Sequence, residues 1–130
     1  MTVPIRILFL AHGFVTAAAG IVLIAAPALI PSAVSIVLPP AANLLPYLLG
    51  AVELGVAVIS LGAARLRDPA AIRLIAVGFA ALHAVSAAVE VLALAQGADP
   101  LLWGNVAVRV IATILFVVVA VRSGAAHRAP

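Results

Sequence analysis

The sequence predicts an all-α integral membrane protein, and three observations carry this prediction. Of the 130 residues, 67% are hydrophobic and only 8% are charged, whereas soluble domains average about half apolar and about a quarter charged residues. The apolar residues fall into four stretches, each at least as long as the roughly 20 residues that a helix needs to cross a bilayer. Turn-forming segments separate the stretches, so we expect a four-helix bundle in one membrane domain over residues 1–130. The predicted spans are residues 5–26, 42–64, 70–95 and 101–121.

The first span is a long apolar run that ends at Pro27, where proline cannot continue a helix. A secretory signal has a shorter apolar core of about 7–15 residues. We therefore expect this segment to remain in the protein as a transmembrane helix.

The connection after the first span, residues 27–41, is apolar, uncharged and rich in proline. We expect it to form an apolar outer loop that lies on the membrane surface as a short interfacial helix. The alternative is a lid over a site that opens outward.

Prolines mark the starts of the third and fourth spans, and glycine pairs mark one helix face on each of the first two spans. Pro69 and Pro100 stand at positions where proline readily begins a helix. Glycines seven residues apart lie on one helix face and allow close helix packing. Two such pairs occur, Gly13 with Gly20 on the first span and Gly55 with Gly62 on the second.

The arginines predict the topology. All seven basic residues are arginines, and six of them lie near the N-terminus, in or just after the connection between the second and third spans, or after the fourth span. Short cytoplasmic loops carry the excess of basic residues, so we expect both termini in the cytoplasm of a multi-pass protein of the cell membrane. The six are Arg6, Arg65, Arg67, Arg73, Arg122 and Arg128.

Several function classes are disfavoured by composition. The absence of cysteine removes disulfides, thiolate metal sites and cysteine nucleophiles. The net charge of +3 comes from arginines that follow membrane topology, so we expect no nucleic-acid partner. No His/Glu spacing fits a metal motif, and we expect neither a metal nor a cofactor.

The informative residues are the ionisable ones inside the spans. A charge at the bilayer centre costs at least about 2.5–3.5 kcal/mol, so such groups usually face the protein interior and mark function. Helical periodicity gives each span one polar stripe. The residues are His12, Glu53, His83, Glu90 and Arg109.

We predict an interior acid–base site formed by Glu53, His83, Glu90 and Arg109. Arg109 stays protonated, and its estimated depth lies between those of the two glutamates. Since arginine extends toward the nearer surface, we favour Glu90 as its partner, with Glu53 deeper beside His83 and able to carry a proton. A purely structural ion pair with hydrogen-bonded histidines is the alternative.

Four further polar or aromatic residues are candidates for ligand binding. Tyr47 and Trp103 lie near the outer ends of their spans and otherwise serve as interfacial anchors. Asn105 shares a helix face with Arg109, while His12 lies nearer the inner end of the first span.

A family resemblance comes from the second span. The segment Pro46-Tyr-Leu-Leu-Gly-Ala-Val-Glu-Leu-Gly55, with the Leu-Gly pair ending at Gly62 and the basic Arg65, resembles the second helix of DoxX-like small bacterial membrane proteins. The resemblance covers about residues 46–75 and implies a four-helix fold with Glu53 as an interior polar residue. Some family members are associated with quinone-linked thiosulfate oxidation.

These observations leave three interpretations of function. The first is a protein that binds a lipophilic small molecule, with a cofactor-free acid–base isomerase or cyclase as its enzymatic form. The second is a proton-coupled small transporter, and the third is an accessory subunit of a membrane, quinone-linked complex. A homo-oligomer is compatible with all three.

Overall fold

The computed structural model describes residues 2–126, with side chains described as far as Gly124. The described chain is helical, and four of its helices are long and apolar enough to cross a membrane. This confirms the predicted all-α class and the four spans of a multi-pass membrane protein. His127 and Arg128, expected in the cytoplasm, lie outside the described residues. The helices are α1 Val3–Ala25, α2 Leu29–Ser32, η1 Pro40–Ala42, α3 Leu44–Ala63, α4 Pro69–Ala95 and α5 Leu102–Ala126.

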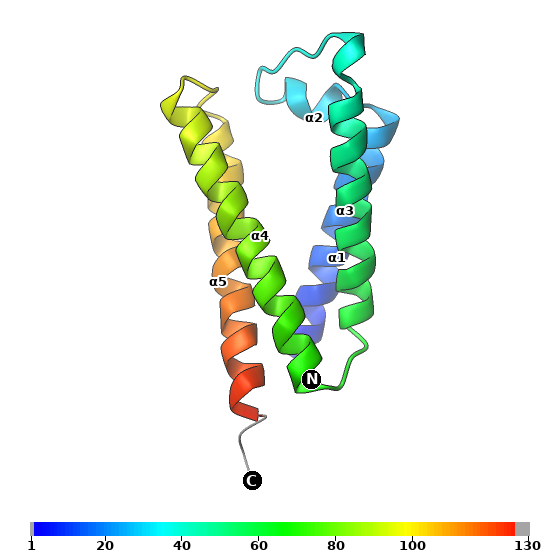
Figure 1. Cartoon of the computed structure of the whole chain (residues 1–130), viewed down its shortest axis with the longest axis vertical. Coiled ribbons are helices and arrows are strands. Elements are labelled where there is room, and N and C mark those ends of the chain that lie inside the picture. Colours follow the sequence, from blue (N-terminus) through cyan, green and yellow to red (C-terminus); the bar gives the residue numbers. More distant parts are fainter. Residues whose placement is uncertain (1, 127–130) are drawn as a thin grey trace. The chain divides into compact units, whose positions relative to one another are not determined.

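The chain divides into two helical units, Met1–Arg65 and Leu66–Pro130. In the first, α1 packs against α3, and in the second, α4 packs against α5 (Figure 1). The union of the four helices in one bundle over residues 1–130 stays a prediction.

Glycine sets the distance between α1 and α3. A Cβ added to Gly20 would lie 2.8 Å from the Gly50 carbonyl oxygen, and one added to Gly50 would lie 2.8 Å from the Gly20 oxygen. Gly13 is equally close to Leu61, whose side chain would lie 2.7 Å from an added Cβ. The two backbones therefore touch at this point, as in other membrane helix pairs with small residues at the contact.

The second expected glycine pair does not take part in this contact. A Cβ at Gly55 or Gly62 would meet no atom within 4 Å. This pair therefore lies away from the contact between α1 and α3, and the close helix packing expected of it stays a prediction. α3 presents a different face to α1, the one that carries Gly50, Ala57 and Ser60, all of which are buried.

The connection between α1 and α3 contains the expected short helix. α2 is a single turn, and η1 begins just before α3. Together with the end of α1 they line an open hollow of about 480 Å³, whose lining residues include Pro27, Ser32 and Asn43. The position of this loop at the membrane surface stays a prediction.

In the second unit, local signals fix both ends of α4. Asp68 caps α4 by accepting hydrogen bonds from the backbone N–H groups of Ala70 and Ala71, at 3.0 and 3.4 Å. Gly97 follows the last turn of α4 with a φ of +95°, which glycine adopts without steric cost. The backbone N–H of Ala98 then donates to the Ala93 oxygen at 3.0 Å, which is the usual glycine-ended helix terminus.

Candidate functional site

An ion pair joins α4 to α5. Arg109 Nε donates to Glu90 Oε1 at 2.6 Å. Glu90 lies five residues before the end of α4 and Arg109 seven residues after the start of α5, so both are about 7–11 Å from the ends that face each other. This is the pairing favoured by the tendency of arginine to extend toward the nearer surface.

Asn105 completes the cluster from the preceding turn of α5. Its Nδ2 donates to the same Glu90 oxygen, Oε1, at 2.7 Å. One carboxylate oxygen therefore accepts two hydrogen bonds. The other oxygen, Oε2, is buried and has no partner among the described residues.

The hydrogen-bonding capacity of the pair is only partly used. Arg109 binds through Nε alone, and no other hydrogen bond joins its side chain to a described residue, although a guanidinium has five N–H donors. The side chains of Arg109 and Glu90 are 24% and 15% exposed. The cluster thus offers unused donors on Arg109 and an unused acceptor on Glu90.

Next along α5, the Thr113 hydroxyl donates to the Arg109 carbonyl oxygen at 2.8 Å. A serine or threonine that bonds back to its own helix satisfies its hydroxyl without a partner helix. Thr113 is thereby compatible with an apolar surrounding.

His83 lies two helical turns before Glu90, within an aromatic cluster. Its ring stacks on Phe116 with centroids 6.0 Å apart and planes 6° apart. Phe79 meets Phe116 edge to face at 5.2 Å. His83 therefore shares a face of α4 with Glu90 but lies about 10 Å further along the helix.

In the first unit, His12 is tied to α3 by a short chain of hydrogen bonds. Ser60 Oγ donates to the Phe9 carbonyl oxygen at 2.9 Å and lies 3.0 Å from His12 Nδ1. The carbonyl can only accept and the hydroxyl has one hydrogen, so with both bonds formed His12 donates from Nδ1. These hydrogen bonds link α1 to α3, and they give both His12 and the buried Ser60 a polar partner.

The other predicted site residues are placed only within their own units. Glu53 is half-buried on α3, and Tyr47 lies on the first turns of the same helix with 42% of its surface exposed. Trp103 is 56% exposed at the start of α5. The structure thus brings together Glu90, Arg109 and Asn105, while a joint site with Glu53 and His12 stays a prediction.

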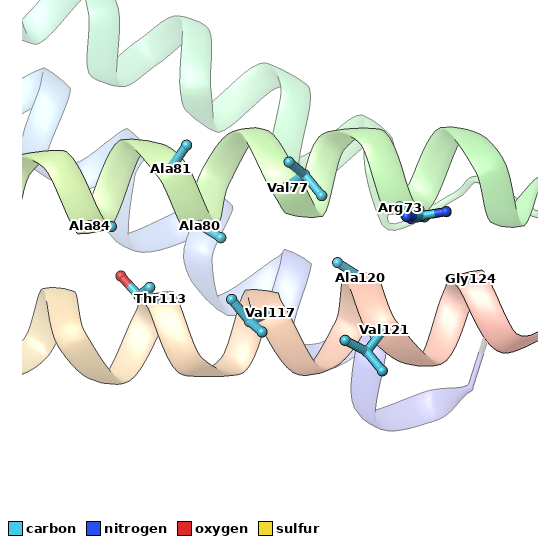
Figure 2. A pocket seen from close by; sticks show the side chains of 10 residues that line it. All are labelled: Arg73, Val77, Ala80, Ala81, Ala84, Thr113, Val117, Ala120, Val121 and Gly124. Carbon is cyan, nitrogen blue, oxygen red and sulfur yellow. The ribbon is translucent and has the colours of Figure 1, made fainter.

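A groove between α4 and α5 was not expected from the sequence. It has a volume of about 1000 Å³ and is lined mainly by alanine and valine, with Arg73 at one end (Figure 2). Alanines and valines alone give no functional signal in so apolar a chain. The only available signal was Arg73, which lies inside the third predicted span rather than before it.

Comparison with known proteins identifies no relative. No family model, curated protein or solved structure matches the chain.

Proposed function

We propose that this protein binds a lipophilic small molecule in the membrane through the cluster of Glu90, Arg109 and Asn105. The observation that carries the proposal is the incomplete hydrogen bonding of the ion pair. Buried polar groups normally have partners, because an unpaired one costs about 1–3 kcal/mol. In an apolar surrounding a ligand supplies such partners.

The unused groups define the chemistry of the ligand. Arg109 offers N–H donors and Glu90 offers an acceptor, so a matching ligand group both accepts and donates. A hydroxyl, a carboxylic acid or a hydroquinone does so, and an isoprenoid, sterol-like or polyketide molecule can carry one. Arg109 is the accessible member of the pair, whereas Glu90 Oε2 requires a rotation of the carboxylate.

Acid–base isomerisation or cyclisation is the enzymatic form of this proposal. A carboxylate that removes a proton from the bound molecule and returns it at another atom changes the position of a double bond without a redox partner. In the proposal, Glu53 and His83 serve as further proton carriers. Replacement of Glu53 by glutamine keeps its shape and removes its proton chemistry, so turnover is expected to be lost while the fold is retained.

Binding of a lipophilic compound to the Glu90 cluster can be measured directly. The full chain is purified in mild detergent, extracted with organic solvent and searched for a lipophilic compound by mass spectrometry. Glu90→Gln removes the carboxylate charge and one acceptor oxygen, and is expected to reduce the compound at least about tenfold, since a hydrogen bond to a charged group contributes roughly 1.5–3 kcal/mol.

Asp99→Asn is the matched control for this measurement. Asp99 also lies in the second unit, where its Oδ1 accepts a hydrogen bond from the Leu101 N–H at 2.9 Å, and asparagine can keep that bond. The control should retain the compound. Equal amounts in Glu90→Gln and the parent chain would contradict the proposal.

The proposed topology places both termini in the cytoplasm and residues 27–41 outside the cell membrane. Since the chain has no cysteine, single cysteines at the exposed positions Thr2 and Ser32 give unambiguous labels. An impermeant thiol reagent added to intact cells should label Ser32→Cys and spare Thr2→Cys until the membrane is opened. Labelling of both from the same side would contradict the topology.

A further inference from the structure

The groove between α4 and α5 has an apolar wall and one charged end. Val77 and Ala84 line it from α4, and Thr113 and Val117 line it from α5 (Figure 2). Arg73 stands at the end nearest the start of α4. From Arg73 to Ala84 the groove follows eleven residues of α4, or about 16 Å.

Arg73 has no partner within the described chain. No hydrogen bond or ion pair joins its side chain to any described residue, and its guanidinium lies along α5 beside Gly124, 3.5 Å from where a Cβ would be. A second, smaller cavity of about 380 Å³ adjoins it, lined by residues that include Pro69 and Ser123. Arg73 therefore borders both cavities.

The charges at this end of the second unit favour an anion. Arg67 and Arg122 are exposed there alongside Arg73. Asp68 is the acid nearest to them in sequence, and both of its oxygens already accept hydrogen bonds at the start of α4. The other described acids of the second unit are Glu90, which is paired with Arg109, and Asp99, which follows the opposite end of α4.

From these observations we propose that the groove binds one anionic phospholipid. Arg73 binds the phosphate, and one acyl chain lies along the alanines and valines. A guanidinium pairs well with a phosphate because its planar N–H groups match the oxygens, and basic pockets between membrane helices bind anionic headgroups. This site is separate from the Glu90 cluster and does not depend on the function proposed for it.

Native mass spectrometry can test this site on the full chain. The protein is exchanged into mixed micelles with equal amounts of phosphatidylglycerol and phosphatidylcholine. The parent chain should retain one phosphatidylglycerol in preference to phosphatidylcholine. Arg73→Gln should reduce the retained phosphatidylglycerol at least about tenfold, whereas Arg122→Gln should reduce it no more than about fivefold, since a hydrogen bond to a charged group is worth more than attraction to a nearby charge.

A second pair of variants tests the apolar wall. Ala81 lines the groove and Ala88 does not, although both are exposed on α4. Ala81→Leu should reduce retention of both lipids, and Ala88→Leu should leave it unchanged. Circular dichroism of all four variants verifies that the helices are retained.

Three results would overturn the proposal. Equal losses in Arg73→Gln and Arg122→Gln would mean general attraction to the anionic surface. Equal retention in Ala81→Leu and the parent chain would mean that no acyl chain lies in the groove. Loss of a dimer in Ala81→Leu, with no lipid bound to the parent chain, would mean that a second copy covers the groove.

Discussion

Replacement of Arg109 by alanine is expected to lower the free energy of unfolding by about 3 kcal/mol. Removing one member of a buried ion pair costs roughly 3–5 kcal/mol because the other charge is left without a partner. The lower end of that range applies here, since the side chains of Arg109 and Glu90 are still 24% and 15% exposed. Unfolding of the purified chain with increasing sodium dodecyl sulfate, followed by circular dichroism, measures the change.

Arg122→Ala is the control for Arg109→Ala, because Arg122 lies on the same helix, is exposed and makes no described ion pair. It should change stability by less than about 0.5 kcal/mol. Combining Arg109→Ala with Glu90→Gln should restore part of the loss, since the uncompensated charge is then gone. A loss in Arg109→Ala no larger than in Arg122→Ala would show that the pair does not hold α4 to α5.

The Glu90–Arg109 pair could be predicted only in part from helical depth. The high cost of an isolated charge in a membrane calls for a partner, but helical rise places Arg109 between Glu53 and Glu90 in depth, and the tendency of arginine to extend toward the nearer surface favours Glu90. The additional bond from Asn105 follows from its position four residues before Arg109. The unused oxygen of Glu90 could not be predicted, because periodicity does not give side-chain rotamers.

The helix boundaries were predictable for a related reason. Proline fixes its own φ in any tertiary context and glycine readily adopts the positive φ at which helices end, and α4 begins at Pro69 and ends just before Gly97. The groove beside Arg73 could not be predicted in this way. Its volume depends on how α4 and α5 pack, and the alanines and valines that line it resemble those elsewhere on the two helices.

The glycine faces show where periodicity alone fails. Gly55 and Gly62 have the same spacing as Gly13 and Gly20, yet only the α1 pair lies at the contact between α1 and α3. Spacing identifies residues on one face of a helix, but it does not decide which face meets the partner. On α3 the buried polar Ser60, bonded to the Phe9 carbonyl oxygen, marks the face that packs, and Gly50 lies on it.

Replacement of Gly20 by alanine is therefore expected to destabilise the first unit by about 1–3 kcal/mol, the usual cost of adding a group to a packed interior. The new Cβ would lie 2.8 Å from the Gly50 carbonyl oxygen. That oxygen belongs to the backbone of α3, so it can move only if the two helices separate. The same detergent unfolding assay measures the effect.

Gly55→Ala is the matched control, since its Cβ meets no atom within 4 Å. Stability should stay the same or rise by up to about 1 kcal/mol, because alanine favours a helix over glycine. Gly50→Ala should match Gly20→Ala, because each glycine faces the other's carbonyl oxygen. If Gly20→Ala and Gly55→Ala behave alike, the backbones of α1 and α3 do not touch at Gly20, and the two helices are held together by other contacts, such as the hydrogen bonds that link His12, Ser60 and Phe9.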